Sequence, residues 1–379
     1  MTTESGRATA PCAAAAAERH LDLMRQALAL ARRAEGLTRP NPPVGALVVK
    51  NGRIIGSGWH QGAGTPHAEA LALSAVGAHA RGATLYVTLE PCCTQGRTPP
   101  CTGAIIAAGI KTVVAAIRDP NPRHRGRGFR QLRRAGIEVI EGVGAEEAGE
   151  LITPFARWVS AGRPYLTLKL AMTLDGKIAD YRGHSQWITG PAARREVQAL
   201  RRRADAILVG AGTVRADNPS LLPRPAHGRR PWRVVVDSRG ELEDHYQIFQ
   251  PPSAARTIVA TTRHCPENIR ARRRAAGAQV WALPTAAGRV SLPALFRRLG
   301  ALGLLHVVCE GGGELAAALI RARLVDEFWF FVAPRILGGK TAIGAVGGPG
   351  WPLPSAPELV FTGCRQVGRD LLIKARPAR

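Results

Sequence analysis

The sequence contains no run of eighteen or more apolar residues, the length that a membrane-spanning helix requires, so it predicts no membrane span. Residues 1–17 also lack an apolar segment. They carry Glu4 and Arg7 beside an alanine run at 13–17, which is not the pattern of a secretion signal. We therefore interpret residues 1–17 as a disordered tail and expect a cytoplasmic protein with no membrane partner.

Acidic and aromatic residues are scarce. The chain has 28 Asp and Glu against 52 Lys and Arg, a formal net charge of +24, and 5% aromatic residues. Excess positive charge can indicate a nucleic-acid-binding surface. It can equally reflect the arginine, alanine, glycine and proline usage of a high-GC genome. The arginines are scattered along the chain and few aromatic residues accompany them. We therefore favour the second interpretation and expect no nucleic-acid partner, with some arginines serving an anionic small substrate.

Cysteine is also infrequent, with 7 residues in a chain of 379. Without a secretion signal, this number argues against a disulfide framework and favours metal binding, catalysis or burial. The length suggests two or three domains, and the 45% hydrophobic content is enough for each domain to bury a core.

Alternating strand and helix patterns divide the chain into two α/β halves. A helical period at 18–34 is followed by an apolar strand at 44–49, the turn signal Asn51-Gly52 and a return strand at 54–59. Strands and helices then alternate, as is typical of a layered domain. Ala161-Gly162-Arg163-Pro164 interrupts this alternation, so we predict domains at 18–161 and 162–379. Further strands are expected in the second domain at 165–171, 206–209, 233–237, 257–261, 279–283, 305–309, 327–332, 359–362 and 371–375.

Four residues of the first half form the pattern of a hydrolytic zinc site. His67 and Glu69 open a predicted helix, Cys92 follows a strand at 84–89, and Cys101 comes just before the next helix. One His and two Cys ligands leave a fourth zinc position for water, whose pKa the metal lowers to about 7. Glu69 is placed to carry the proton without binding the metal. The pattern His-x-Glu…Pro-Cys is typical of zinc-dependent nucleobase deaminases.

The cysteine spacing departs from that pattern, because eight residues separate Cys92 from Cys101 where two are usual. Cys93 adjoins a ligand and could compete for the metal. Outside the two ligands, we interpret the cysteines as small buried apolar residues. They are Cys12, Cys93, Cys265, Cys309 and Cys364.

The second half contains a strand, a glycine run and a helix in succession at 308–314 (VCEGGGE). Backbone N–H groups of such a loop can hold a phosphate at the start of the helix. The loop is not G-x-G-x-x-G, so the Rossmann fingerprint is absent, and a flexible connection is the alternative interpretation.

Ordered motifs extend over most of the chain. In the first half they are RPNPPVG (39–45), PHAE (66–69), TLEPC (88–92), GRTPPC (96–101), DPNP (119–122) and GRG (126–128). In the second half they are KL (169–170), LDG (174–176), SQWIT (185–189), TV (213–214), ADNP (216–219) and EGG (310–312). From about residue 18 to residue 376, the sequence resembles the bacterial riboflavin-pathway deaminase/reductase family.

The resemblance implies a cytidine-deaminase-like three-layer α/β domain followed by a dihydrofolate-reductase-like α/β domain. It implies deamination of 2,5-diamino-6-(5-phosphoribosylamino)pyrimidin-4-one and then NADPH-dependent reduction of the ribosyl side chain to ribityl. The product would be 5-amino-6-(5-phosphoribitylamino)uracil. The long cysteine spacing would be normal in this family, with Zn2+ bound by His67, Cys92 and Cys101 and with Glu69 as the proton donor.

The same resemblance implies that the deaminase substrate is contacted by Asn41, Arg97, Asp119 and Asn121. One departure concerns this pocket. The family usually has Ser-His after the first zinc cysteine, whereas this chain has Cys93-Thr94, so a histidine that would contact the substrate is missing.

In the second half, the resemblance implies a set of NADPH contacts and a set of substrate contacts. The NADPH contacts are Ala171, Trp187, Thr213, Asp217, Ser238, Gly312, Gly313, Glu314, Leu315, Ala316, Ala317 and Ala318. The substrate contacts are Ser185, Arg201, Leu221, Arg224 and Glu310. The substrate phosphate calls for arginine, a role we expect for Arg201 and Arg224. Lys169 would steer the open-chain aldehyde or the phosphate, or form a structural salt bridge.

Two other functions fit parts of the sequence. A zinc deaminase of tRNA or of a free nucleobase would use the same zinc residues, but it leaves the second α/β half unexplained. A second half that only stabilises the deaminase is the other alternative, and binding of NADPH would argue against it. We also expect a homo-oligomer, although no residue pattern specifies the number of subunits.

Overall fold

The computed structural model describes residues 10–96, 98–225, 230–251 and 254–378. The chain divides into two compact units, Met1–Ser160 and Ala161–Arg379. No helix in these ranges is both long enough and apolar enough to cross a membrane. Six cysteines are free: Cys92, Cys93, Cys101, Cys265, Cys309 and Cys364.

The first unit is built on a five-stranded sheet in the order β2-β1-β3-β4-β5. β1 pairs antiparallel with β2 and β3, and β3, β4 and β5 are parallel. Asn51 and Gly52 join β1 to β2 with positive φ angles of 49° and 75°, as the turn signal predicts. The strands are β1 (Gly45–Lys50), β2 (Arg53–Trp59), β3 (Thr84–Val87), β4 (Thr112–Ala115) and β5 (Glu138–Glu141).

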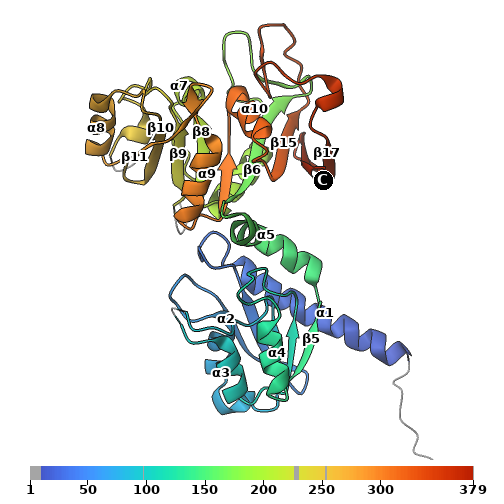
Figure 1. The fold of residues 1–379 in the computed structure, drawn as a ribbon. Coiled ribbons are helices and arrows are strands. Elements are labelled where there is room, and N and C mark those ends of the chain that lie inside the picture. Colours follow the sequence, from blue (N-terminus) through green and yellow to red (C-terminus); the bar gives the residue numbers. More distant parts are fainter. Residues whose placement is uncertain (1–9, 97, 226–229, 252–253, 379) are drawn as a thin grey trace, which may run out of the picture. The chain divides into compact units, whose positions relative to one another are not determined.

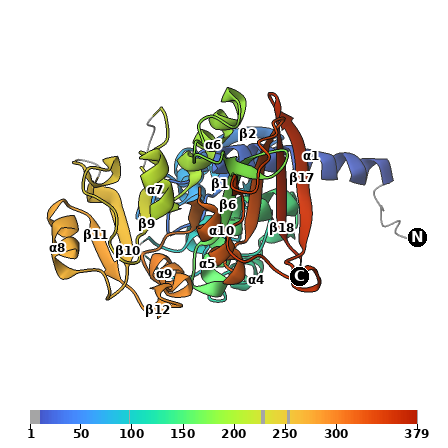
Figure 2. The same ribbon diagram turned by 90° about the horizontal axis from the view of Figure 1, so that it is seen from above.

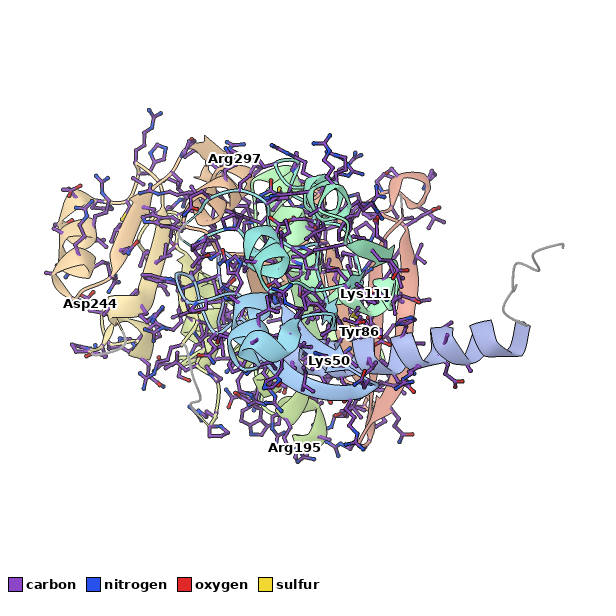
Figure 3. The ribbon with its side chains drawn as sticks, turned by 90° about the horizontal axis from the view of Figure 1, so that it is seen from below. Lys50, Tyr86, Lys111, Arg195, Asp244 and Arg297 are labelled. Carbon is purple, nitrogen blue, oxygen red and sulfur yellow. The ribbon has the colours of Figure 1, made fainter. Side chains whose placement is uncertain are left out.

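Helices cover both faces of this sheet, which gives the expected three layers (Figure 1). On one face, α2 (Ala68–Ser74), α3 (Cys101–Ala107) and α4 (Arg127–Arg134) pack on a core that includes Leu85 and Phe129. On the other face, α1 (Ala10–Arg32) and α5 (Ala145–Ala161) bury Met24, Leu28 and Tyr86. The Tyr86 hydroxyl, labelled in Figure 3, lies 2.8 Å from His20 Nδ1 of α1.

The start of α1 corrects one prediction. Residues 1–17 are expected to be a disordered tail, but the helix already begins at Ala10. Alanine has the highest helix propensity, so the alanine run extends the helix toward the N-terminus without needing a buried face. Ala14 through Ala17 are indeed exposed.

The second unit is built on a nine-stranded sheet in the order β11-β10-β9-β8-β14-β6-β15-β18-β17, which Figure 2 shows from β11 at one edge to β17 at the other. The seven strands from β11 to β15 are parallel, and β18 and β17 are antiparallel additions. The strands are β6 (Tyr165–Thr173), β8 (Ala206–Gly210), β9 (Trp232–Val236), β10 (Thr257–Thr261), β11 (Gln279–Ala282), β14 (His306–Cys309), β15 (Glu327–Ala333), β17 (Leu359–Val367) and β18 (Asp370–Pro377).

Each face of this sheet has its own core. On one face, α9 (Leu292–Ala301) and α10 (Gly313–Arg321) pack against Leu166, Leu208 and Val234. On the other, α6 (Pro191–Arg203) and α7 (Ala211–Asp217) pack against Ile207 and Val235. The remaining elements are α8 (Glu267–Ala275), the pair β7 (Lys177–Ala179) and β16 (Ile343–Gly344), the hairpin β12 (Thr285–Ala286) and β13 (Arg289–Val290), and the short 3-10 helices η1 (Gly77–Ala80), η2 (Gln247–Phe249), η3 (Ala254–Arg256) and η4 (Leu353–Ser355).

Gly45 is required where α1 crosses β1. A Cβ atom at this position would lie 2.1 Å from the Ala27 carbonyl oxygen and 2.8 Å from the Ala31 nitrogen.

We expect Gly45→Ala to lower the free energy of unfolding of the first unit by about 1–3 kcal/mol, because the helix backbone must move away. Urea denaturation measures this change. The matched control is Gly149→Ala in α5, where a Cβ meets nothing within 4 Å. That variant should be neutral or stabilising by up to about 1 kcal/mol, and equal destabilisation of both would contradict the argument.

Candidate functional site

The three predicted zinc ligands lie together in the first unit. His67 immediately precedes α2, Cys92 follows β3, and Cys101 is the first residue of α3. His67 Nδ1 lies 3.5 Å from Cys92 Sγ and 3.4 Å from Cys101 Sγ, and the three ligand atoms all lie within 4.8 Å of one another. One imidazole nitrogen and two sulfurs facing a common point are the donor set of a three-ligand zinc centre with an open fourth position. The residues therefore fit the metal.

The surroundings of Cys92 favour a negative charge on its sulfur, whereas those of Cys101 oppose one. The Cys101 side chain hydrogen bonds to Cys92, which lowers the pKa of the Cys92 thiol to about 4 and raises the pKa of Cys101. The Cys101 backbone N–H also donates to Cys92 Sγ at 3.3 Å. A thiolate is the form of cysteine that binds zinc, so the lowered pKa of Cys92 favours metal binding at that sulfur.

Glu69 lies in the first turn of α2, beside the ligands, and is 3% exposed. Burial raises the pKa of Glu69 to about 7. A carboxyl group with such a pKa can both accept and release a proton near neutral pH, which is what a general acid–base group must do.

His60 and Thr98 fix the orientation of this site, and neither is identified from the sequence. Thr98 Oγ1 lies 3.4 Å from His67 Nε2, so it can accept the proton of the nitrogen that faces away from the sulfurs. His60 is 2% exposed, and burial lowers its pKa. Its Nδ1 lies 3.3 Å from the Pro66 carbonyl oxygen and its Nε2 lies 3.0 Å from Asn41 Nδ2. In the neutral tautomer, Nδ1–H donates to Pro66 and Nε2 accepts from Asn41.

Glu90 is a third residue that sequence reasoning missed. Its carboxylate is 2% exposed and accepts three backbone hydrogen bonds, from the N–H groups of Asp119 (3.1 Å), Gly126 (2.8 Å) and Gly128 (2.9 Å). A Cβ at Gly128 would lie 2.2 Å from the Pro91 carbonyl oxygen, so only glycine allows α4 to come this close. The sequence does contain one signal for Glu90: it is an acidic residue that follows an apolar strand and stands two positions before a metal ligand.

The loop that Glu90 holds carries two of the predicted substrate contacts. Asp119 is 6% exposed, and burial raises its pKa to about 6. Its Oδ1 accepts the Asn121 backbone N–H at 2.8 Å. Cys93 stands apart from the three metal-ligand atoms, and its Sγ lies 3.7 Å from His124 Nδ1 of the same loop. The predicted contact Arg97 lies outside the described residues.

In the second unit, the glycine run joins β14 to α10 and forms a cradle. Gly312 has a φ of 83°, and a Cβ there would lie 3.1 Å from Thr213 Oγ1. A Cβ at Gly313 would lie 2.7 Å from the Gly344 carbonyl oxygen. The start of α10 with glycines that permit close approach fits the diphosphate of a dinucleotide. The side chains of Leu315, Ala316 and Ala317 are buried in the core, so a ligand would meet this part of the helix through backbone N–H groups of its first turn.

The other predicted cofactor positions follow the carboxyl ends of adjacent strands. Ala171 lies on β6, Thr213 in α7 just after β8, and Ser238 just after β9. In open parallel sheets, ligands bind beyond these strand ends. Asp217 closes α7 and accepts a hydrogen bond from the Ser185 hydroxyl at 2.8 Å. Trp187 is 61% exposed, with the Arg194 guanidinium 4.7 Å from its ring centroid.

The structure brings Arg201 together with Glu310, and both are predicted substrate contacts. Arg201 Nε and Nη2 bind the two Glu310 oxygens at 2.6 and 2.8 Å, and Nη1 donates to the Leu222 carbonyl at 3.2 Å. The guanidinium is therefore already engaged, since a buried arginine pairs with the nearest carboxylate. Although burial opposes ionisation, Arg201 holds the pKa of Glu310 below its usual value.

Lys169 lies near this pair on β6, and burial lowers its pKa, with the charges of Glu310 and Asp217 opposing that shift. Arg224 is exposed and donates to Ser220 Oγ at 3.4 Å, so its guanidinium can still meet an anion. Leu221 is 2% exposed and packs in the core, which leaves only its backbone for a ligand.

Both halves match known family models. Residues 17–117 match the cytidine and deoxycytidylate deaminase zinc-binding region, and residues 164–373 match the RibD C-terminal domain. The riboflavin biosynthesis protein RibD of Escherichia coli is 42% identical over 367 residues, which cover 92% of this chain and 97% of that protein. The RibD protein of Aquifex aeolicus is 44% identical over 327 residues, covering 86% of this chain and 89% of that protein.

Solved structures agree. Acinetobacter baumannii RibD superimposes with a TM-score of 0.86 at 35% identity, covering 96% of this chain and 100% of that chain. The diaminohydroxyphosphoribosylaminopyrimidine deaminase/5-amino-6-(5-phosphoribosylamino)uracil reductase of Thermotoga maritima gives a TM-score of 0.85 at 38% identity, covering 96% and 99%. The zinc-binding region and the reductase domain fit Zn2+ and NADPH as cofactors, and the substrates are small pyrimidines. The chain belongs to the RibD family and is a bifunctional deaminase and reductase of riboflavin biosynthesis.

Proposed function

We propose that residues 18–161 deaminate 2,5-diamino-6-(5-phosphoribosylamino)pyrimidin-4-one and that residues 162–379 then reduce its ribosyl side chain, giving 5-amino-6-(5-phosphoribitylamino)uracil. The observation that carries the first step is the convergence of His67, Cys92 and Cys101 beside the buried Glu69. The two activities for which the Thermotoga maritima relative is named support the choice of substrates.

In the deaminase half, His67, Cys92 and Cys101 hold zinc, which when bound supplies the acidity that turns water into a nucleophile at neutral pH. Glu69 takes one proton from the attacking water and delivers it to the ring nitrogen. It then takes the second proton from the hydroxyl now bonded to the ring carbon and delivers it to the amine, which leaves as ammonia while the carbonyl forms. Its pKa of about 7 suits both transfers. Asn41, Asp119 and Asn121 orient the pyrimidine, and Arg97 contributes a positive charge to the same pocket.

Glu90 acts as a positioning residue for this reaction. Its carboxylate ties the segment just before Cys92 to the loop that carries Asp119 and Asn121, through three backbone hydrogen bonds. Hydrogen bonds to a charged acceptor contribute about 1.5–3 kcal/mol each, so the loop is held firmly relative to the zinc ligands.

In the reductase half, NADPH supplies the hydride, and the protein provides binding and orientation. The first turn of α10 would hold the diphosphate. The rest of the cofactor would lie along the strand ends, in contact with Ala171, Trp187, Thr213, Asp217 and Ser238. Arg224 meets the substrate phosphate. Arg201 orients Glu310, and Lys169 and Ser185 face the ribosyl chain from the neighbouring elements. We also propose that the protein is a cytoplasmic homo-oligomer and that it has no nucleic-acid partner.

The proposed order of reactions is tested by mass spectrometry on zinc-loaded protein given the diamino substrate, with and without NADPH. We expect the substrate first to exchange an amino group for oxygen, and then to gain two hydrogens only when NADPH is present. Reduction before deamination would contradict the order. Deamination without any reduction would remove the proposed role of the second unit.

Two substitutions separate zinc binding from proton transfer. Glu69→Gln should keep zinc and lower the deamination rate by about 10²–10⁴-fold, because the amide cannot carry the proton. His67→Ala should lose both zinc and deamination. Metal analysis and product assays measure the two quantities. Reduction of the deaminated intermediate, supplied directly, is the internal control and should be unchanged in both variants. Full deamination by Glu69→Gln would exclude Glu69 as the acid–base group.

Replacing Glu90 tests the positioning role. In Glu90→Gln, the amide NH2 faces a backbone N–H donor, so at least one of the three hydrogen bonds is lost, at a cost of about 1–3 kcal/mol. We expect the KM of deamination to rise by a larger factor than kcat falls, with zinc content retained. Glu90→Asp, which keeps the charge, should recover part of the effect. A loss of zinc in both variants, with KM unchanged in the remaining holoenzyme, would show that Glu90 serves the metal site instead.

A further inference from the structure

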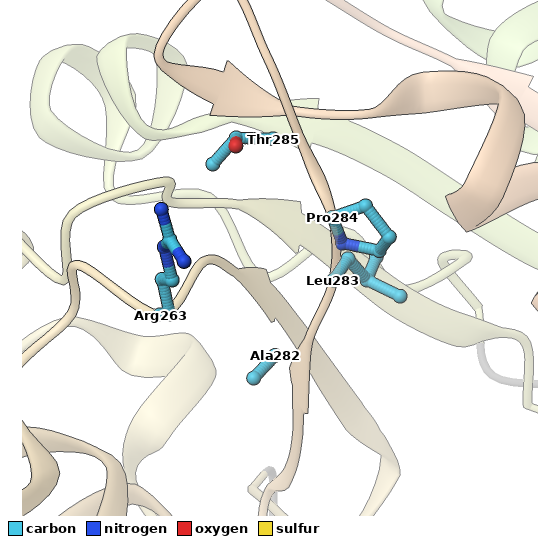
Figure 4. Close-up of a pocket in the computed structure, with 5 residues that line it drawn as sticks. All are labelled: Arg263, Ala282, Leu283, Pro284 and Thr285. Atoms are coloured by element: carbon cyan, nitrogen blue, oxygen red, sulfur yellow. The ribbon is translucent and has the colours of Figure 1, made fainter.

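A cavity of about 350 Å³ lies at the carboxyl ends of β10 and β11 in the second unit. It is lined by Arg263, Ala282, Leu283, Pro284 and Thr285. Figure 4 shows Arg263 on one side of the cavity and the segment from Leu283 to Thr285 on the other. None of the functions described above uses these five residues.

The cavity is tied directly to Ser238, the proposed cofactor contact after β9. The Ser238 carbonyl accepts the Thr262 N–H at 3.1 Å and the Thr262 hydroxyl at 2.8 Å, and Arg263 is the next residue. The Val290 N–H of the β12–β13 hairpin donates to Ser238 Oγ at 3.0 Å. Arg263 therefore directly follows a residue that is hydrogen bonded to Ser238. Thr285 pairs with Val290 in the β12–β13 hairpin, and Val290 is hydrogen bonded to Ser238.

The strand order indicates which end of a dinucleotide would reach this cavity. The proposed contacts lie at the carboxyl ends of β6, β14, β8 and β9, in the order Ala171, Gly312, Thr213 and Ser238. These four strands are consecutive in the sheet, and β10 and β11 come next. Neighbouring strands lie about 4.8 Å apart, so the cavity is one to two strand widths beyond Ser238. If the reacting ring of the cofactor lies near Ala171 and its diphosphate lies at the start of α10, its adenosine reaches this cavity.

The charge in the cavity selects the kind of adenosine. Arg263 is exposed and makes no hydrogen bond or ion pair with any residue in the described ranges, and no carboxylate lines the cavity there. Dinucleotide sites hold an unmodified ribose with an Asp or Glu, whereas a 2′-phosphate is accommodated by a nearby arginine. A guanidinium binds a phosphate through two parallel N–H donors.

We propose that Arg263 binds the 2′-phosphate of the NADPH adenosine, with the Thr285 hydroxyl beside it, and thereby selects NADPH over NADH. This inference rests on the proposed reductase function of the second unit. It adds a specificity-determining residue that hydride transfer itself does not require.

The test measures dissociation constants of NADPH and NADH for the full-length protein by titration calorimetry. Wild type should bind NADPH at least tenfold more tightly than NADH. Arg263→Ala should weaken NADPH binding by about 10- to 100-fold, the loss expected for a charged hydrogen-bonded contact, and leave NADH binding unchanged. Arg297→Ala is the matched control, because Arg297 is an exposed arginine of α9, labelled in Figure 3, outside the cavity. It should leave both constants unchanged.

Two smaller probes isolate the phosphate. Adenosine 2′,5′-bisphosphate should compete with NADPH in wild type and lose affinity in Arg263→Ala, whereas adenosine 5′-phosphate should bind both proteins equally weakly. Unchanged NADPH binding in Arg263→Ala, or an equal loss for NADPH and NADH, would overturn the inference while leaving the reductase proposal intact. Failure of wild type to bind either dinucleotide would instead overturn the reductase proposal, and this inference with it.

Discussion

The buried carboxylate of Glu90 is the constraint on which the first unit depends. A carboxylate removed from water must recover its hydrogen bonds, and Glu90 does so with three backbone N–H groups from residues 119–128. Because Cys92 lies two residues further along the chain, the same interaction sets the distance between a metal ligand and the start of the loop at Asp119. Sheet, loop and α4 thus converge on one side chain, and the glycine at position 128 is what permits their close approach.

The second unit uses its buried charges in a similar way. The Glu310 carboxylate comes directly after β14 and is satisfied by a bidentate arginine from α6, so the strand end and the helix are held together where the cofactor cradle begins. In both units, parallel strands deliver polar residues to one edge of the sheet, and a satisfied carboxylate fixes the loops that leave that edge. The reacting groups are therefore placed by elements that these carboxylates tie together.

Local sequence signals predicted the longer strands, the hairpin at Asn51-Gly52 and the grouping of His67, Cys92 and Cys101, because each depends on spacing along the chain. Sequence reasoning missed His60, Thr98 and Glu90 because they act through partners that are distant in sequence. Nothing near Arg201 indicates that its guanidinium is already bound to Glu310, 109 positions away. The early start of α1 was missed for another reason, since an exposed alanine helix has no apolar face to reveal it. The short strands β7, β12, β13 and β16 are too brief to carry a period.

The bidentate pair of Arg201 and Glu310 also limits how this sequence can change over evolutionary time. The two side chains are 15% and 7% exposed. Losing one partner of such a buried pair leaves an uncompensated charge, which destabilises a protein by about 3–5 kcal/mol, a large part of the stability of a whole domain. We therefore expect related sequences to keep both residues or to replace both together. A comparison of the two positions among related sequences would show how strongly this buried pair is constrained, independently of the catalytic residues.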